Sequence, residues 1–344
     1  MKKNTMRAYV KKSKKDKPSF EEMPIPKVGE NDVLVQVRSA LICGTDLLVY
    51  NDRLDEANYP LVLGHEFSGK IVDKGSKVRD FEIGDRVAAN AVTYCRKCFF
   101  CKTGRWNLCK NFQHLGIHCD GCFADYVVLP DFCVTRIPDD MEYDIGSAIG
   151  PVALVYHAIA KVNIRPSSLV VVSGPGPIGM TAIQLAIISG AKVLNTGMSV
   201  DAWRLEKSRQ LGAMTVNVEK ENLKEKIMEI SDGEGADLFI ETSGAPIIQQ
   251  GFEVLKSGGE VLLIGYSPKP QPISALDVVF RELRLEGSSG YNDESWKMGL
   301  KIVADHPSIA KSTISHVFNF EELEKGFQVM LERTAIKVAV HYPQ

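Results

Sequence analysis

A glycine-rich turn near the middle of the chain constrains its fold more than any other feature. Residues 169–173, Leu-Val-Val-Val-Ser, are typical of a buried strand, the sequence Gly174-Pro-Gly176-Pro-Ile-Gly179 follows at once, and residues 180–189 have helical periodicity. A GxGxxG triplet placed between a strand and a helix is typical of dinucleotide-binding folds. We expect Gly174 to allow the tight turn, Gly176 to let a pyrophosphate approach, and Gly179 to pack the helix against the strand.

The helix after this turn is the predicted anchor for the cofactor phosphates. Pro177, Ile178 and Gly179 stand at its amino terminus, where N–H donors and the helix dipole attract an anion. These residues, together with Gly174 and Gly176, are therefore the predicted contacts of NAD or NADP. The alternative is a tight strand-to-helix turn that binds nothing.

Apolar runs alternate with amphipathic helical stretches from about residue 152 onward, which is typical of βαβ units around a parallel sheet. Six runs are strand candidates, at residues 169–173, 192–196, 215–218, 236–241, 259–265 and 283–287. Six is the number of strands in a complete dinucleotide-binding sheet. The pattern predicts an α/β, doubly wound Rossmann domain over residues 152–287.

The residues after the second strand leave the choice between NAD and NADP open. The run ends in Asn195-Thr-Gly-Met-Ser199, with no carboxylate where the ribose of NAD is usually held. Ser199 as a hydrogen-bond donor and Arg204 as a cation would suit the 2'-phosphate of NADP. Asp201 would instead suit the 2'-hydroxyl of NAD. A helix cap for Asp201 and a surface charge for Arg204 are the alternatives.

Residues 1–151 have a different pattern. Short alternating apolar segments, separated by Gly, Pro and Asp, predict an antiparallel, barrel-like β domain. The clearest segments are residues 32–40, 67–74, 86–90 and 123–129. The chain from residue 288 onward contains a helical stretch at 320–332 and a strand-like stretch at 337–342, and we expect it to return to this first domain.

Four cysteines lie within one short segment of the first domain: Cys95, Cys98, Cys101 and Cys109. A long chain without an export signal favours a reducing compartment, where clustered thiols indicate metal and not disulfides. Four thiolates form a closed tetrahedral zinc site, so we predict a structural zinc in a lobe at about residues 93–111. Its binding energy would stabilise a loop of low apolar content. An iron–sulfur cluster or free thiols are the alternatives.

Three further residues of types that bind metals lie outside this four-cysteine segment. Cys43 ends one strand-like segment, and the pair His65 and Glu66 begins another. Three such ligands can hold zinc with one coordination position open for substrate. An ion of this kind polarises an alcohol oxygen and lowers its pKa, so that hydride can leave carbon for C4 of a nicotinamide.

At these residues the chain resembles the zinc-containing medium-chain dehydrogenases, especially the sorbitol (polyol) and threonine dehydrogenase branch, over nearly its whole length. The resemblance is carried by Cys43-Gly-Thr-Asp46, Gly64-His-Glu-Phe-Ser-Gly69, Gly84-Asp-Arg-Val87, the four-cysteine lobe and the glycine-rich turn. It implies a GroES-like catalytic domain over residues 1–151 and 288–344, a Rossmann domain, an active-site cleft where the two meet, and a homodimer or homotetramer. It also implies reversible oxidation of a secondary alcohol, with a small-molecule alcohol or carbonyl as substrate.

The resemblance also implies a role for each motif residue. Cys43, His65 and Glu66 match the ligands of the catalytic zinc, and Thr45 matches the hydroxyl that contacts the reacting oxygen. We expect Thr45 to accept the substrate proton and pass it on, and Asp46 to orient His65. With the four-cysteine site, the expected content is two zinc ions per chain.

Three positions depart from the polyol dehydrogenases. Gly150-Pro151 stands where a glutamate often precedes the proline, and Leu48 where a histidine often follows the ligand cysteine. His316-Val317 replaces a His-Arg pair. The proton is therefore expected to leave through Tyr50 or directly to solvent. A polyol, sugar alcohol or related secondary alcohol other than sorbitol is the expected substrate, with L-threonine or a simple alcohol as the alternative.

Composition narrows the classes of partner. The chain has 41 basic and 43 acidic residues, a net charge of -2, which gives no long-range attraction for a nucleic acid. No segment has the roughly 18 apolar residues of a membrane span or the core of a signal peptide, so we expect a cytoplasmic protein without a membrane partner.

A zinc-free NADPH reductase and a non-catalytic dinucleotide-binding protein are the competing functional classes. Two bound zinc ions would exclude the first, and the open metal site argues against the second.

Overall fold

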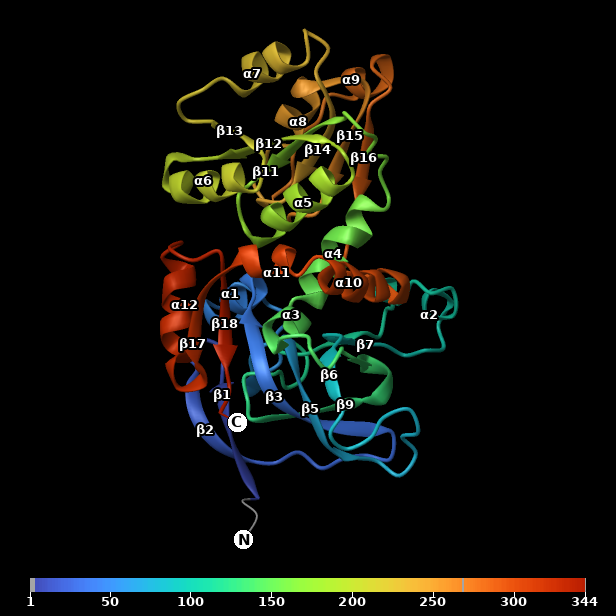
Figure 1. Cartoon of the computed structure of the whole chain (residues 1–344), viewed down its shortest axis with the longest axis vertical. Coiled ribbons are helices and arrows are strands. Elements are labelled where there is room, and N and C mark those ends of the chain that lie inside the picture. The colour runs from blue at the N-terminus through green and yellow to red at the C-terminus, as the bar shows by residue number, and fades with distance from the viewer. Residues whose placement is uncertain (1–3, 268, 344) are drawn as a thin grey trace. The chain divides into compact units, whose positions relative to one another are not determined.

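The computed structural model describes residues 4–267 and 269–343, which form two compact units (Figure 1). Unit 1 comprises Met1–Ala153 and Asn292–Gln344, and unit 2 comprises Leu154–Tyr291. Helix α4 (Ile149–Ile159) runs from the first unit into the second. Among the described residues, no helix is both long and apolar enough to cross a membrane.

Unit 1 is rich in strands. They are β1 (Thr5–Lys11), β2 (Ser19–Pro24), β3 (Asp32–Ile42), β4 (Leu61–Val62), β5 (Glu66–Lys74), β6 (Arg86–Ala89), β7 (Val92–Thr93), β8 (Gln113–His114), β9 (Tyr126–Pro130), β10 (Val134–Arg136), β17 (Ile314–Asn319) and β18 (Lys337–His341). A seven-stranded sheet has the order β10-β6-β5-β3-β18-β17, with β9 also paired to β3. Its pairings are antiparallel except for β17 with β18. A second sheet has the order β2-β1-β4, and β7 pairs with β8.

Strand β3 is the centre of unit 1, because it pairs with β5, β9 and β18. Alternate residues of its first half, Val33, Val35 and Val37, are buried and belong to one large apolar core. Strand residues of this type have high β propensity and pack well on a pleated surface. The chain from residue 314 onward therefore completes the first unit by adding β18 beside β3 and β17 beside β18.

The helices of unit 1 have between four and thirteen residues. They are α1 (Gly44–Tyr50), α2 (Phe99–Lys102), α3 (Tyr143–Ser147), α10 (Asp293–Asp305), α11 (Ser308–Thr313) and α12 (Leu323–Leu331), with 3₁₀ turns η1 (Trp106–Leu108), η2 (Asp131–Cys133) and η4 (Phe320–Glu322). Helix α12 packs on β17 and β18 and buries Leu323 and Phe327 in the core of the unit.

Unit 2 is a parallel sheet with helices on both faces (Figure 1). Its strands are β11 (Leu169–Ser173), β12 (Lys192–Gly197), β13 (Met214–Asn217), β14 (Ala236–Glu241), β15 (Leu255–Leu263) and β16 (Arg284–Gly287); its helices are α5 (Pro177–Ile188), α6 (Ala202–Gln210), α7 (Leu223–Ile230), α8 (Ile248–Val254) and α9 (Ala275–Phe280), with the turn η3 (Ser199–Asp201). The order β13-β12-β11-β14-β15-β16 is all parallel. This order confirms the predicted doubly wound Rossmann fold.

Several element boundaries differ from those predicted, most of them by one or two residues. The strand expected at 123–129 is β9, which begins only at Tyr126, because Phe123 accepts a hydrogen bond from Tyr9 of β1 before the chain joins the main sheet. The strand expected at 259–265 is β15, which begins earlier, at Leu255, and ends at Leu263. Helix α5 begins at Pro177, whose fixed φ suits the first position of a helix.

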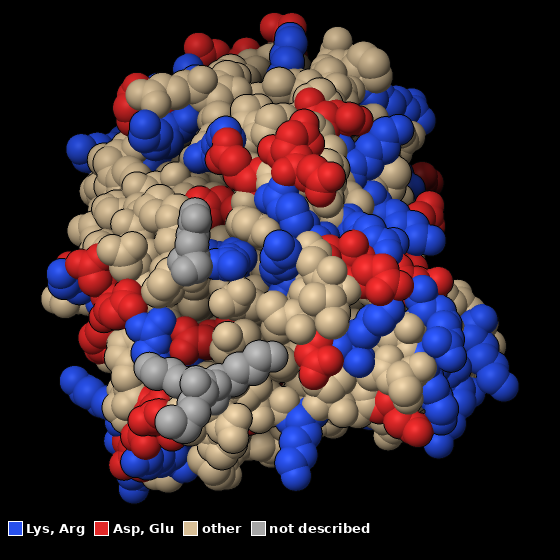
Figure 2. All heavy atoms as spheres, turned by 60° about the horizontal axis from the view of Figure 1, so that its bottom comes forward, with Lys and Arg blue, Asp and Glu red and all other residues tan. Residues whose placement is uncertain are grey.

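Acidic and basic side chains are intermixed on the surface shown in Figure 2. Lysine and arginine are most dense at the lower right of this view.

Candidate active site and metal centres

Three strand ends meet at one place in unit 1. Residue 41 at the end of β3 pairs with Glu66 at the start of β5, and Ile42 pairs with Val338, the second residue of β18. This register brings Cys43, which follows β3, to the start of β5. The thiol of Cys43 and one side-chain ligand atom each of His65 and Glu66 all lie within 4.8 Å of one another.

Asp46 holds two of these residues at once. Its Oδ2 accepts a hydrogen bond from the N–H of Cys43 at 2.8 Å, and its Oδ1 lies 3.1 Å from Nδ1 of His65. A carboxylate at Nδ1 fixes the tautomer that leaves Nε2 free to bind a metal. Asp46 therefore orients His65, as expected from the sequence. Thr45 Oγ1 lies 3.9 Å from the Cys43 sulfur.

A glycine before His65 is required by the local packing. Gly64 has a φ of +92°, and a Cβ on it would lie 2.7 Å from the ring of Phe123 and 2.9 Å from the sulfur of Cys122. Any larger residue would clash and would strain the backbone. Gly64 thus lets the chain enter β5, with His65 just before the strand and Glu66 as its first residue.

Lys337 is a residue of this site that sequence reasoning missed. Its Nζ lies 2.5 Å from Oε2 of Glu66, and both side chains are buried. Burial lowers the pKa of Lys337, but the charges of Glu66 and Cys43 outweigh it and raise that pKa. A lysine at the edge of an apolar run resembles an ordinary solvated strand end, so only the pairing of β18 with β3 reveals its position.

The charges around Cys43, His65 and Glu66 favour a cation. Burial lowers the pKa of His65, but Asp46 and Cys43 raise it well above its usual value. The anionic groups that favour the protonated form of His65 also favour a metal cation in this buried site. A thiolate, an imidazole and a carboxylate within reach of one ion are also a donor set that zinc accepts. The residues present therefore fit a zinc ion.

His114 packs against this group from the end of β8. Its ring lies edge to face with that of His65, with the ring centroids 4.7 Å apart. Nδ1 lies 2.6 Å from the carbonyl oxygen of Leu115, and burial lowers the pKa of His114 to about 3. His114 is therefore a neutral imidazole beside the metal ligands. The sequence left it unassigned because it stands among loop residues far from Cys43 and His65.

Tyr50, one of the two expected routes for the proton, points to another part of unit 1. Its hydroxyl donates to Glu324 at 2.6 Å, and its ring stacks on Phe327 of α12 with the centroids 4.9 Å apart. Because this hydroxyl is already held by α12, direct release of the proton to solvent fits the structure better.

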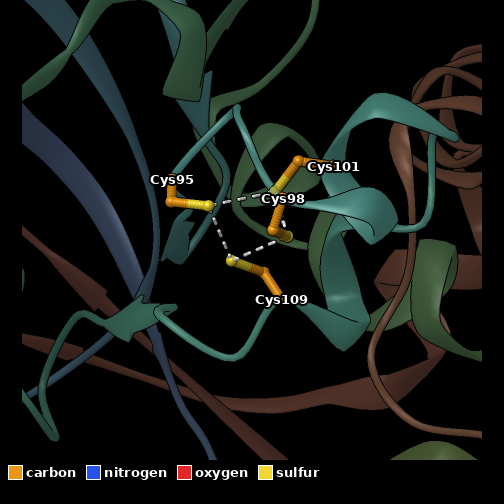
Figure 3. A group of neighbouring side chains, drawn as sticks. All are labelled: Cys95, Cys98, Cys101 and Cys109. Carbon is orange, nitrogen blue, oxygen red and sulfur yellow. Dashed lines mark hydrogen bonds between the residues drawn. The ribbon is translucent and has the colours of Figure 1, made fainter.

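The four cysteines of the predicted lobe converge on one point, as Figure 3 shows. Adjacent Sγ atoms lie 3.5 to 3.8 Å apart. Four thiolates that each lie about 2.3 Å from a tetrahedral zinc would be about 3.8 Å from one another. Hydrogen bonds from the N–H groups of Lys97 and Cys98 lower the pKa of Cys95 to about 6, which favours its thiolate. The geometry fits one zinc ion.

The lobe contains an aromatic pair, and a hydrogen bond from that pair ties the lobe to α10. Trp106 is buried and stacks on Tyr94, with the ring centroids 4.8 Å apart and the planes within 4° of parallel. The indole N–H of Trp106 donates to Asp293 of α10 at 2.7 Å. Apart from this pair the lobe has little apolar core, so a bound ion would be its main source of rigidity.

The glycine-rich turn of unit 2 has the geometry that a bound dinucleotide requires. Gly174 has a φ of +97°, and a Cβ on Gly179 would lie 2.0 Å from the carbonyl oxygen of Gly174. A Cβ on Gly176 would meet no atom within 4 Å, so the backbone there faces open space. Pro177 and Ile178 begin α5 beside that space. A pyrophosphate could approach the helix amino terminus there.

The three candidates for the ribose contact differ in exposure. Ser199 is exposed at the end of β12. Asp201 is buried, accepts a hydrogen bond from the N–H of Met198, and forms an ion pair with Arg204 at 3.6 Å. Arg204 is also buried and lies over the ring of Trp203. The helix-cap alternative for Asp201 is therefore what the structure shows, and the Arg204 guanidinium faces the protein.

Two family models match the chain, and similar proteins match nearly its whole length. The family described as alcohol dehydrogenase GroES-like domain matches residues 29–139, and the family described as zinc-binding dehydrogenase matches residues 177–305. A sorbitol dehydrogenase of Halalkalibacterium halodurans is 34% identical over 324 residues, which cover 93% of this chain and 94% of that protein. An L-threonine 3-dehydrogenase of Bacillus licheniformis is 35% identical over 342 residues, covering 97% and 98%.

Solved structures agree with these sequence matches. A zinc-binding dehydrogenase of Sinorhizobium meliloti, in complex with NADP, superposes with a TM-score of 0.90 and is 30% identical. The match covers 98% of this chain and 99% of that one. The expected pairing of a GroES-like with a Rossmann fold is thereby confirmed.

Proposed function

The chain belongs to the zinc-binding dehydrogenases, and from this premise we propose that it transfers hydride between a secondary alcohol and NAD or NADP. The proposed alcohol is a polyol, a sugar alcohol or a related compound. The observation that carries the proposal is the convergence of Cys43, His65 and Glu66 within 4.8 Å, because a purely structural or binding protein has no use for a three-ligand metal site.

Cys43, His65 and Glu66 are the proposed ligands of the catalytic zinc, which when bound polarises the alcohol oxygen and lowers its pKa. Asp46 would keep the Cys43 N–H and the His65 ring fixed through its two oxygens. Lys337 would neutralise the buried carboxylate of Glu66. These contacts preorganise the ligands, so that little reorganisation accompanies the reaction.

Thr45 is the proposed first acceptor of the alcohol proton. It lies at the start of α1, with its hydroxyl 3.9 Å from the Cys43 sulfur and partly exposed. A hydroxyl is a poor base alone, so it would pass the proton on to solvent while it takes one up. The nicotinamide would be held through the glycine-rich turn of unit 2, with Gly174, Gly176, Pro177, Ile178 and Gly179 around the pyrophosphate.

Cys95, Cys98, Cys101 and Cys109 are proposed to hold a second, structural zinc. Four thiolates leave no coordination position for substrate, so this ion would not take part in the chemistry.

A substrate screen tests the proposal. The zinc-loaded protein would be assayed with NAD and NADP in parallel against polyols, 2,3-diols, L-threonine and simple primary and secondary alcohols, by the absorbance of the reduced nicotinamide. We expect turnover of a secondary alcohol with at least one dinucleotide, and its loss when zinc is removed. Turnover that persists without zinc would contradict the proposal and favour a zinc-free reductase.

L-threonine dehydrogenase is the second candidate, because a relative with that activity is 35% identical over nearly the whole chain. The two candidates are separated by the same screen, since threonine carries an ammonium and a carboxylate that a polyol lacks.

We further propose a cytoplasmic location, which suits eight cysteines that are all free thiols, and a homodimer or homotetramer.

A further inference from the structure

The end of strand β12 carries a carboxylate that the sequence of β12 does not supply. The ribose of a dinucleotide lies at this end of the second strand in a doubly wound sheet, and an acidic residue there selects NAD. Ser199, twenty residues after Gly179, occupies the expected position. Its N–H donates a hydrogen bond to Oε2 of Glu219 at 2.7 Å.

The pairing of two parallel strands brings Glu219 to this place. Gly197, the last residue of β12, pairs with Asn217, the last residue of β13, and the N–H of Val218 donates to the carbonyl of Gly197. Parallel strands end at the same edge of a sheet, so the residues that follow them are neighbours. Glu219 therefore reaches Ser199 although they are far apart in the sequence.

Two further contacts fix the carboxylate. The side-chain amide of Asn217 donates to the hydroxyl of Ser199 at 3.1 Å, and Asn217 Oδ1 accepts from the N–H of Glu219 at 3.1 Å. Hydrogen bonds from the hydroxyl and N–H of Ser199 hold the pKa of Glu219 below its usual value. Glu219 is exposed and ionised at neutral pH, so a ligand can reach its charge.

The two residues that would decide cofactor choice by sequence position are directed elsewhere. Asp201 and Arg204 are buried and form an ion pair with each other. Ser199 and Glu219 are both exposed beside the end of β12. Lys220 also lies near enough for its charge to act on Glu219, but the two hydrogen bonds from Ser199 act more strongly.

We infer that Glu219 makes this protein select NAD over NADP, by accepting a hydrogen bond from the adenosine ribose and repelling a 2'-phosphate. The inference rests on the proposed function, because it requires the dinucleotide to lie along the glycine-rich turn. A phosphate dianion beside a carboxylate is destabilised by like charge, and specificity of this kind comes from the repulsive element. The structure of the Sinorhizobium meliloti relative contains NADP, which is the opposite of the preference inferred here. The inference therefore rests on the residues of this chain and not on that relative.

Direct binding measurements test the inference without a known substrate. The zinc-loaded protein would be titrated with NADH and with NADPH, and the dissociation constants read from nicotinamide fluorescence. We expect NADH to bind at least about tenfold more tightly. In Glu219→Gln the amide oxygen can still accept from the Ser199 N–H, so the turn is kept and only the charge is lost. This variant should reduce the NADH preference by about tenfold, mainly through tighter NADPH binding.

Glu229→Gln is the matched control, because Glu229 is an exposed residue of α7 in the same unit and pairs with Lys226. It should leave both dissociation constants unchanged. Tighter binding of NADPH by the unaltered protein, or an unchanged preference in Glu219→Gln, would overturn the inference alone. If neither dinucleotide bound, the proposed function would fail and this inference with it.

Discussion

Asp46 is the residue on which the geometry of the proposed catalytic site most depends. One carboxylate fixes the backbone of Cys43 and the ring of His65, so two ligands from separate strands share a single support. Such support raises metal affinity by holding ligands in place before the ion arrives. The burial of Asp46 also means that its charge acts on the site without screening by salt.

Asp46→Asn should therefore weaken zinc binding and turnover together. An asparagine can accept from only one of the two donors, and we expect zinc affinity or kcat to fall by about 10- to 100-fold with KM changed less. Competition with a chelator and steady-state kinetics would measure both. Asp144→Asn removes a different histidine-paired carboxylate, which contacts His341, and should leave both quantities unaltered. Equal effects in the two variants would argue against a positioning role.

Single residues also show where sequence reasoning stops. Cys43, His65 and Glu66 were predictable as a set, because each is a metal-binding residue type at a recognisable motif position. Lys337, His114 and Glu219 were not, because each reaches its place through a strand pairing or loop that joins distant parts of the chain. Sequence motifs are thus enough to find candidate metal ligands. The charged and polar groups around a site are found only once the tertiary contacts are known.

At the scale of elements, the four-cysteine lobe has the clearest division between sequence and structure. The convergence of its four cysteines is predictable from their spacing, whereas the hydrogen bond from Trp106 to Asp293 of α10 is not. Strands β11 and β14 were predictable to the residue because both are buried runs bounded by turn residues. Strand β15 was not, because it begins at Leu255 and continues through Gly258, a residue type that is rare inside strands. The assignment of residues 1–151 with 288–344 and of 152–287 to the two domains stays a prediction.

Cys98→Ala should unfold the lobe without touching the open metal site. The variant removes a thiolate whose sulfur lies 3.5 Å from Cys101 and 3.8 Å from Cys109. We expect loss of one zinc per chain and an unfolding midpoint lower by roughly 5–10 °C, measured by metal analysis and calorimetry. Cys119→Ala, outside the cluster, should keep both zinc ions. An unaltered zinc content in Cys98→Ala would refute the four-thiolate site.

At the scale of the whole molecule, unit 2 presents an apolar surface that a single chain leaves uncovered. Leu276, Val279 and Phe280 of α9 are 67%, 70% and 78% exposed. Strand β16 is at the edge of the sheet among the described strands, and its Leu285 is also exposed. Contiguous apolar groups beside an open strand edge are typical of an interface between subunits. A second copy of the chain is the proposed occupant.

Phe280→Asp should accordingly shift the protein toward a smaller assembly, because it places a charge within that surface. Light scattering coupled to gel filtration would measure the molar mass across a concentration series. Ile83→Asp alters an equally exposed apolar residue of unit 1, at 62%, and should leave the mass as it is. A protein that is monomeric before either substitution would contradict the proposed oligomer.

The central claim is that a zinc ion held by Cys43, His65 and Glu66 is required for turnover. Its most direct test is to measure zinc content, turnover and thermal unfolding of Cys43→Ala in one preparation. The account predicts one zinc per chain in place of two, a loss of turnover of at least about 1,000-fold, and an unfolding midpoint close to that of the unaltered protein. Normal turnover in Cys43→Ala with both zinc ions retained would contradict it.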